Sequence, residues 1–167
     1  MNEDNVSRIV REACQAWPGY EAHSLEVVLR ILRAYHFFDQ ELVRGLVDYD
    51  VSPAESGVLI ELRLAGPPYK MTPTQLHNRL LVTSGGMTGL IDRVQRRGLV
   101  CRSPDPGDRR SILVELTKDG LELIEGVANT HFRIMEHLTE GLTSEERDCL
   151  AGLLRKLLFS IESSNGQ

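Results

Sequence analysis

Apolar residues recur along this sequence with the period of an α-helix over most of its length. Before residue 52 they are spaced three, four or seven positions apart, which predicts one long amphipathic helix up to that point. Two more long stripes follow residue 117, and the last has leucines on both of its faces. The first stripe consists of Leu25, Val28, Leu29, Leu32, Tyr35, Leu42, Leu46 and Tyr49.

Capping signals mark three helix beginnings. A Ser or Thr followed three positions later by Glu or Gln forms a capping box, in which each residue satisfies a backbone N–H of the first turn. This pattern occurs at Ser52–Glu55, Thr72–Gln75 and Thr143–Glu146. In the first two, a proline occupies the first helical position, where its missing N–H costs nothing.

Three shorter helices are predicted between residues 52 and 98. The first stops before Gly66-Pro67-Pro68, and the second spans about residues 72–81. Thr83 is expected to cap the third, which ends at Arg96-Arg97-Gly98. The residues expected to face inward from these helices are Val58, Leu59, Leu62, Leu76, Leu80, Met87, Leu90, Ile91 and Val94.

After Gly98 the pattern changes to that of short strands. Residues 99–102 and 111–116 flank a polar, turn-rich segment at 103–110, which predicts a β-hairpin with a charged tip. Thr117 is expected to cap the next long helix, whose stripe includes Phe132, Met135 and Leu138, and residues 163–167 are expected to fray.

Two short helices joined by a tight turn and followed by a basic hairpin form a winged helix-turn-helix. The predicted fold class is therefore mainly α with a small β-hairpin wing. In this arrangement the second helix of the pair, the recognition helix, enters the DNA major groove. Because its apolar stripe must face the core, we expect the opposite face to meet bases through Ser84, Gly85, Thr88 and Gly89, and a phosphate through Arg93.

Composition agrees with one soluble globular chain. Of 167 residues, 41% are hydrophobic and 26% charged. The longest apolar runs are a few residues, and the first twenty residues are interrupted by charges, so neither a membrane span nor a secretory signal is expected. We therefore expect a cytoplasmic protein with no membrane partner.

The charge is distributed unevenly. The net charge is −5, but residues 70–110 carry eight basic and three acidic side chains, which is +5, and the rest of the chain is −10. A cationic segment on an acidic protein suits a surface that faces a polyanion.

Other function classes have little support. Cys14, Cys101 and Cys149 form no CxxC pair and are expected to be buried or half-buried thiols. The five histidines lack the i,i+4 spacing of a helical zinc pair, and no catalytic motif is evident. We expect no catalytic residue, no metal site and no cofactor.

The recognition helix and hairpin contain a run of residues more specific than the helix pair alone. It comprises Thr88, Leu90, Ile91, Asp92, Arg93, Arg97-Gly98-Leu99-Val100, Arg102, Asp105-Pro106-Gly107-Asp108-Arg109-Arg110-Ser111 and Leu116-Thr117-Lys118-Asp119-Gly120. With this run and the order of its helices, the chain resembles the MarR family of bacterial transcriptional regulators over roughly residues 25–161. The resemblance implies an obligate homodimer with interlocked first and last helices.

The resemblance also assigns roles within the wing. Arg110 corresponds to the arginine that enters the minor groove, beside Arg109, and Asp108 corresponds to the aspartate that orients it. A guanidinium suits the negative potential of a narrow minor groove. The alternative is a solvated turn whose charges only maintain solubility.

From the pattern and the resemblance together we divide the chain into functional segments. Residues 1–24 form an N-terminal extension, expected to be helical, and residues 51–116 the winged helix-turn-helix. Residues 25–50 and 117–162 form the dimerisation region, and 163–167 a tail. A dimer predicts double-stranded DNA with an inverted-repeat operator whose half-sites lie about one helical turn apart.

Relatives of this kind commonly sense small phenolic or other anionic aromatic molecules, so a repressor released by such an effector is expected. Trp17 and Arg102 match two of four positions in a urate-responsive subgroup, but Gly57 and Leu90 depart from the other two. Trp17, His36 and Arg102 are the candidate effector residues; the alternative for Trp17 is packing. The alternative functions are a protein-interaction adaptor without DNA affinity and a thiol-based redox sensor.

Overall fold

The structure is a computed structural model that describes residues 3–80, 84–108 and 110–165. The chain forms two compact units, residues 1–53 and residues 54–167. Within the described ranges, every helix is too short or too polar to cross a lipid bilayer.

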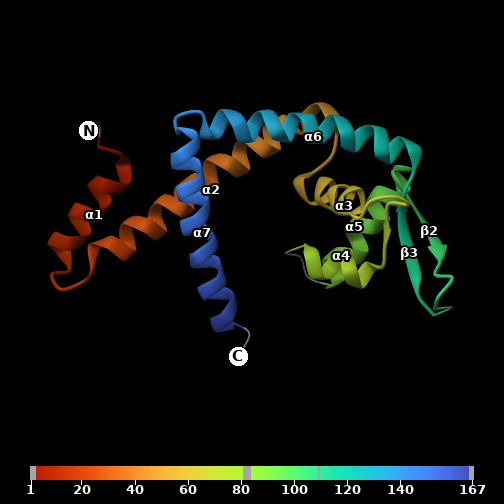
Figure 1. Ribbon diagram of the computed structural model, residues 1–167, viewed down its shortest axis with the longest axis horizontal. Helices are drawn as coiled ribbons and strands as arrows, with labels where there is room; N and C mark the ends of the chain where they lie inside the picture. Colours follow the sequence, from red (N-terminus) through yellow and green to blue (C-terminus); the bar gives the residue numbers. More distant parts are fainter. Residues whose placement is uncertain (1–2, 81–83, 109, 166–167) are drawn as a thin grey trace. The chain divides into compact units, whose positions relative to one another are not determined.

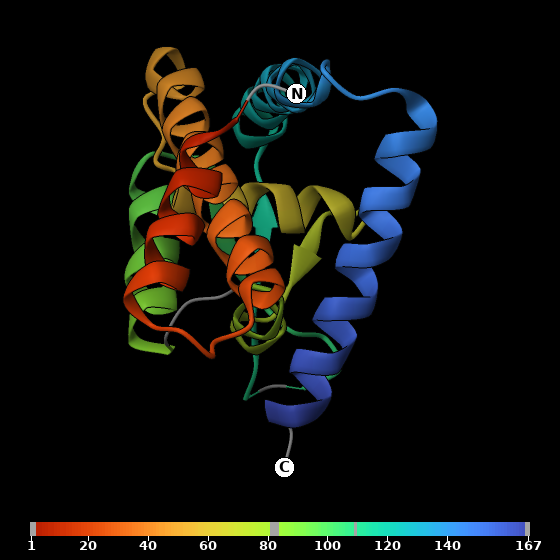
Figure 2. The ribbon, with the colours of Figure 1, turned by 90° about the vertical axis from the view of Figure 1, so that its left-hand side faces the viewer.

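The first unit contains two helices and a short helical turn: α1 (Asn5–Ala16), α2 (Ala22–Gly45) and the 3₁₀ helix η1 (Val47–Tyr49). α1 lies beside α2 (Figure 2). Asp4 caps α1 by accepting the backbone N–H of Ser7 at 2.8 Å, and Arg30 of α2 donates to the same carboxylate at 3.0 Å. The bond from Ser7 lowers the pKa of Asp4, so the carboxylate is ionised at neutral pH and links the two helices.

The long helix predicted before residue 52 is shorter than expected. The α-helical run ends at Gly45, and the chain continues as η1. Glycine has a low helix propensity, and one turn of 3₁₀ helix keeps almost the same apolar spacing as an α-turn. Periodicity alone therefore could not locate this boundary.

The winged helix-turn-helix consists of three helices and three short strands (Figure 1): α3 (Pro53–Leu64), β1 (Lys70–Met71), α4 (Pro73–Arg79), α5 (Ser84–Arg96), β2 (Val100–Pro104) and β3 (Ile112–Leu116). The sheet is antiparallel in the order β1-β3-β2, and Arg102 pairs with Val114 in the hairpin. The predicted hairpin is confirmed, but β1 was missed because two residues are too few to show a period of two.

The predicted helix signals are present where they can be tested. Thr72 and Gln75 exchange both bonds of a capping box, at 3.1 and 2.8 Å, before α4. At the end of α5, Gly98 has a φ of +72°, and Gly98 and Leu99 donate their N–H groups to Gln95 and Val94. This is a Schellman motif, in which glycine permits the left-handed turn. The helix expected over about residues 72–81 ends earlier, at Arg79, because Leu80 is already in an extended conformation. The cap expected at Thr83 lies outside the described residues.

The winged helix-turn-helix, from α3 to β3, is called the lobe below. Its core lies between α3, α4, α5 and the sheet. The predicted α5 stripe is confirmed, since none of its four side chains is more than 3% exposed. Leu80 differs, because it is only half-buried. The fully buried set includes Val58, Leu59, Leu62, Leu76, Ile91, Val94, Val100 and Val114.

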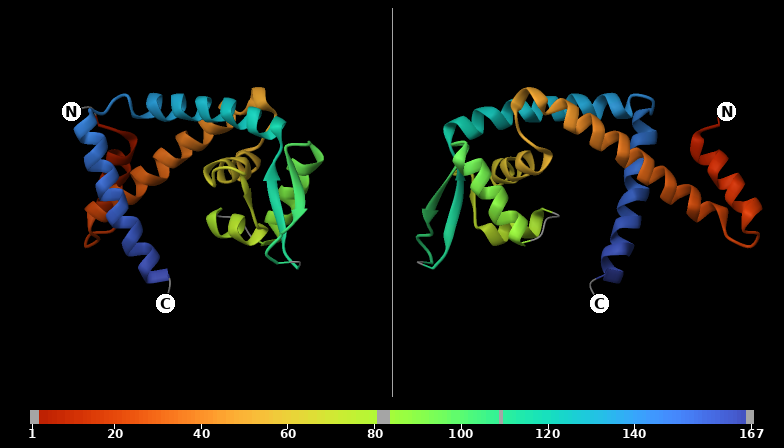
Figure 3. Two further views of the ribbon diagram at one scale, coloured as in Figure 1. Left: turned by 45° about the vertical axis from the view of Figure 1, so that its right-hand side comes forward. Right: turned by 180° about the vertical axis from the view of Figure 1, so that it is seen from behind.

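Two long helices complete the second unit, α6 (Lys118–Thr139) and α7 (Ser144–Asn165). Thr143 and Glu146 exchange the capping-box bonds before α7, at 2.8 and 3.2 Å. Every described side chain of α7 from Ser144 to Ser164 is exposed, and Figure 3 shows this helix leaving the end of α6 as a separate rod. In the segment 163–167, where fraying is expected, the helix continues to Asn165, and the Ser163 hydroxyl donates to the carbonyl of Phe159. Residues 166–167 lie outside the described residues.

The start of α6 approaches the end of the recognition helix very closely. Thr117 caps α6 by accepting the N–H of Gly120 at 3.0 Å, and its hydroxyl donates to the Gly98 carbonyl at 2.7 Å. A Cβ atom at Gly120 would lie 1.9 Å from the carbonyl oxygen of Leu99. Only glycine fits this contact, since the obstacle is backbone rather than a movable side chain.

We therefore expect Gly120→Ala to lower the free energy of unfolding by about 2 kcal/mol or more, as an overpacked core site does. The measurement is urea denaturation followed by circular dichroism. Gly85→Ala is the control, because a Cβ there meets nothing within 4 Å. That variant should be unchanged or up to about 1 kcal/mol more stable through helix propensity. Equal stability of both variants would contradict this role of Gly120.

Candidate nucleic-acid interface

The outward face of α5 carries small residues. Gly85 and Thr88 are exposed and Gly89 is half-buried, while the opposite face is the buried stripe. Ser84 is the first residue of α5, and its side chain lies outside what the structure describes. The face predicted to meet bases is therefore accessible at the three described positions.

Arg93 lies on the same helix but is already paired. Its Nε donates to the Glu55 carboxylate of α3 at 3.3 Å, and 48% of the Arg93 side chain remains exposed. Glu55 is a buried charged residue, with a residue exposure of 8%. Sequence reasoning saw Glu55 only as a cap, because a partner 38 positions away leaves no local signal.

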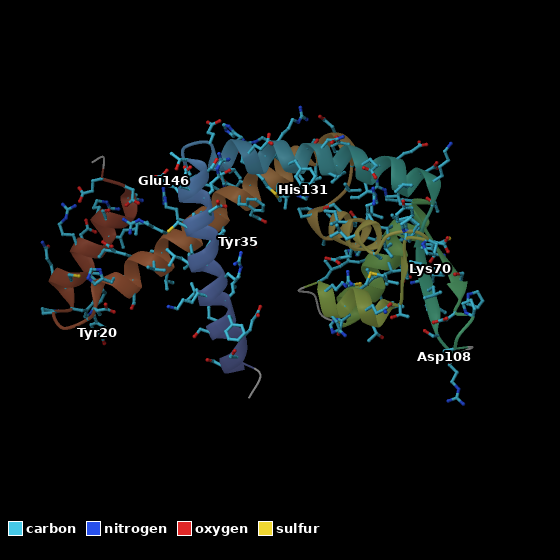
Figure 4. The ribbon with its side chains drawn as sticks, in the orientation of Figure 1. Tyr20, Tyr35, Lys70, Asp108, His131 and Glu146 are labelled. Carbon is cyan, nitrogen blue, oxygen red and sulfur yellow. The ribbon has the colours of Figure 1, made fainter. Side chains whose placement is uncertain are left out.

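The tip of the wing is organised by its aspartates. Asp108 lies at the end of the β2–β3 hairpin (Figure 4), and its carboxylate accepts the backbone N–H of Arg110 at 2.9 Å. Asp105 similarly accepts the N–H of Gly107 at 2.9 Å. The Arg110 side chain is exposed. Asp108 thus directs the main chain at Arg110, whereas the expected contact was with its guanidinium; Arg109 lies outside the described residues.

Arg102 joins the wing to the recognition helix. From β2, its Nη1 donates to Gln95 and its Nη2 to Asp92, both at 2.6 Å and both on α5. Charge-assisted bonds of this length are among the stronger hydrogen bonds in proteins. The side chain predicted to hold an effector is therefore engaged in aligning the two elements that would read DNA.

The positive charge of residues 70–110 is partly neutralised within the lobe. Arg93 pairs with Glu55, and Arg79 pairs with Glu61 at 3.2 Å. Adding these two glutamates to the segment reduces its net charge from +5 to +3. The net positive charge available to a polyanion is thus smaller than the count over residues 70–110 indicates.

The candidate effector residues of the first unit do not share one cleft. Trp17 is 63% exposed and lines an apolar cleft of about 430 Å³ between α1 and α2. His36 is not among the lining residues; its ring lies 5.7 Å from that of Phe37. The cleft is lined by Ile9, Ala13, Cys14, Trp17, Tyr20, Glu21, Ala22, Leu25 and Leu29.

A second apolar cleft of about 430 Å³ lies between α3 and α6. At its edge, Arg63 donates to Glu125 at 2.6 Å and lies 5.3 Å from the ring centre of Tyr69. The bond to Glu125 raises the pKa of Arg63 further, and burial lowers the pKa of His131, labelled on α6 in Figure 4. The cleft therefore offers a permanent cation beside a ring that is neutral at pH 7. Its lining residues are Ile60, Arg63, Leu64, Ile124, Glu125, Ala128, His131, Phe132 and Met135.

Sequence reasoning missed this cleft, because its residues come from two helices that are far apart in the sequence. The apolar stripe predicted along α6 is only partly buried. Ile124 and Val127 are buried, but Phe132, Met135 and Leu138 are exposed. These three apolar positions are visible in the sequence, and they could have indicated an apolar surface on α6 that remains exposed in the single chain.

The cysteines are more accessible than expected. Cys14 is half-buried, but Cys101 and Cys149 are exposed, so the expectation of buried or half-buried thiols is wrong for these two. Cys101 alternates on β2 with the buried Val100, which turns its side chain outward. Within the described part of the chain, no group of three or more His, Cys, Asp or Glu residues is arranged to hold a metal ion.

Comparison with known proteins assigns the family. The sequence profile of the MarR family matches residues 49–111. The transcriptional regulator PecS of Dickeya dadantii is 30% identical over 152 residues, which cover 91% of this chain and 92% of PecS. The chain belongs to the MarR family.

Solved structures of other MarR-family proteins share the fold. A cysteine-to-serine variant of Escherichia coli MarR in complex with operator DNA matches with a TM-score of 0.71 at 32% identity, covering 79% of this chain and 93% of that one. Bordetella bronchiseptica BpsR, whose DNA binding is regulated by 6-hydroxynicotinic acid, matches with a TM-score of 0.69 at 30% identity, covering 79% and 98%. This MarR-family chain is a DNA-binding transcriptional regulator and not an enzyme.

Proposed function

We propose that the protein is a homodimeric repressor that binds an inverted-repeat operator in the cytoplasm and is released by a small anionic aromatic molecule. The observation that carries the dimer is the surface of α7. A soluble chain rarely exposes so large an apolar area, and a second copy is the simplest cover for it. The exposed apolar residues of α7 are Leu150, Leu153, Leu154, Leu157, Leu158, Phe159 and Ile161.

In this proposal the segments divide the work as the sequence suggested. Residues 51–116 read DNA, residues 25–50 and 117–162 hold the dimer together, and residues 1–24 and 163–167 are additions at the two ends. A dimer places two copies of α5 in successive major grooves, and a repressor acts by excluding other proteins from that site.

Base contact is assigned to Ser84, Gly85, Thr88 and Gly89, and phosphate contact to Arg93. Arg110, with Arg109 beside it and Asp108 shaping the turn, is assigned to the minor groove. Support comes from the accessible face of α5 and from the exposed Arg110 at the hairpin tip. The bonds from Arg102 to Asp92 and Gln95 keep the two reading elements in register.

DNase footprinting on the promoter region of the protein's own gene tests this arrangement. The expected result is protection of two inverted half-sites whose centres lie about one helical turn, roughly 10 base pairs, apart. Sedimentation of the free protein should give twice the mass of one chain. Protection of one unpaired half-site by a monomeric protein would contradict the proposal.

Arg110→Ala tests the wing. The variant loses one cationic contact in the minor groove, close to the phosphates. The affinity for DNA should therefore fall to a similar degree for different operators, and the magnitude of the slope of log K against log salt should decrease by about 0.9. The measurement is fluorescence anisotropy of a labelled duplex at several salt concentrations. Lys118→Ala is the control, since Lys118 is exposed but lies at the base of the hairpin and is paired with Glu122. An unchanged slope in Arg110→Ala would remove the wing from the DNA contacts.

We assign the effector to the cleft between α3 and α6. Its walls are largely apolar, as an aromatic ring requires, and Arg63 at the edge can pair with a carboxylate or phenolate. The regulation of BpsR by 6-hydroxynicotinic acid supports this chemical class. Glu125 competes for Arg63, so an anionic effector must exchange with it.

Two opposite variants test this assignment. Arg63→Gln should lose release by 6-hydroxynicotinic acid or benzoate while still binding operator, because the cation is gone. Glu125→Gln should be released at several-fold lower effector concentration, because Arg63 is no longer engaged by a carboxylate. Release is followed by anisotropy of a labelled operator, with neutral benzamide as the matched control ligand. Loss of release in Trp17→Ala, His36→Ala or Arg102→Ala, with both cleft variants unaffected, would place the effector at the residues first proposed.

A further inference from the structure

Glu55 makes an unusual contact with the recognition helix. Its side chain is only 11% exposed, yet it lies 3.3 Å from the Nε of Arg93, which is half exposed. A carboxylate in such a place requires a cation or strong donors to offset its lost hydration. The pair therefore joins a buried group of α3 to the surface of α5 that is proposed to face DNA.

The geometry leaves most of the guanidinium available. Glu55 is contacted by Nε, and Arg93 has two further nitrogens, Nη1 and Nη2. Nη1 lies 3.6 Å from where a Cβ of Gly89 would be, so the guanidinium extends back along the outward face of α5. Glu55 thus holds the Arg93 guanidinium at Nε, while Nη1 lies along the outward face of α5.

We propose that Glu55 is a positioning residue for DNA binding, which holds the Arg93 guanidinium in the orientation that receives a phosphate. This inference rests on the proposed role of α5. A free arginine loses side-chain freedom when it binds phosphate, and this loss costs about two- to tenfold in affinity for a long side chain. Holding the side chain beforehand removes part of that cost.

The lobe contains a matched pair for comparison. Glu61 also lies on α3, is half-buried, and also pairs with an arginine of another helix, Arg79 of α4, at 3.2 Å. Arg79 is at the end of α4 rather than on the reading face of α5. Removing Glu61 therefore reports the cost of losing an ion-paired glutamate from α3 without disturbing Arg93.

The test is a double-mutant cycle on operator affinity with full-length protein. Glu55→Ala in the wild-type background should weaken binding about two- to tenfold, while leaving the salt slope unchanged because the phosphate contact still forms. In an Arg93→Ala background, Glu55→Ala should not weaken binding, since only a negative charge near DNA is removed. Arg93→Ala alone should lower the salt slope by about 0.9.

Further variants separate positioning from folding. Glu55→Gln keeps an oxygen that can accept from Nε and should retain most of the affinity in the wild-type background. If Glu55→Ala does not fold by circular dichroism, Glu55→Leu takes its place, because leucine fills a similar volume without offering an acceptor to Nε. Glu61→Ala should leave operator affinity within twofold of wild type. Each variant is checked by urea denaturation, so that a loss of folded protein is not counted as a loss of affinity.

The outcomes are distinguishable. Equal effects of Glu55→Ala, or of Glu55→Leu in its place, in both backgrounds, tighter binding by that variant in the wild-type background, or an equal loss in Glu61→Ala would each overturn the positioning role. Failure of the wild-type protein to bind any duplex would instead overturn the proposed function, and this inference with it.

Discussion

Burial of the apolar stripe on α5 is the constraint on which the lobe depends. Met87, Leu90, Ile91 and Val94 are almost fully buried, so the helix cannot rotate about its axis without exposing them. Full burial of a side chain of this kind contributes roughly 1.5–3 kcal/mol. The opposite face, with Gly85 and Thr88, is therefore turned outward by packing on the far side of the helix and not by any contact of its own.

Packing sets the approximate orientation of the helices, and ion pairs then fix the positions of individual arginine side chains and of the wing. Arg102 ties the wing to α5, Glu55 holds Arg93, and Glu61 holds Arg79. Each uses a cation that a count of charges would assign to DNA. Three arginines of this lobe, Arg79, Arg93 and Arg102, thus help to organise its surface, and Arg93 still presents part of its guanidinium on the outward face of α5.

The features predicted well from sequence are those set by neighbouring residues. The Thr72–Gln75 box, the Gly98 turn and the α5 stripe are decided within one or two helical turns, and each is present. The two residues of β1 exist because β3 is there to pair with them, which no local pattern reveals. The end of α2 at Gly45 was misjudged because a 3₁₀ turn preserves apolar spacing.

The site was predicted less completely, because many of its contacts join segments that are distant in the sequence. Outward positions on α5 follow from the helical period, but the partners of Arg93 and Arg102 do not, since side chains from distant segments meet only after folding. The cleft between α3 and α6 is similarly non-local. Cys101 was misplaced because its apolar surroundings in sequence belong to the other face of an edge strand.

The contact between Thr117, Gly98 and Gly120 also has a mechanical consequence. One hydroxyl bonds both the terminal turn of α5 and the first turn of α6, and the missing side chain at Gly120 leaves no slack between them. The end of α5 and the start of α6 are consequently held in direct contact, with no gap between them that could absorb a change in their relative orientation. A tilt of α6 would therefore move the C-terminal end of α5, the helix that we propose enters the major groove.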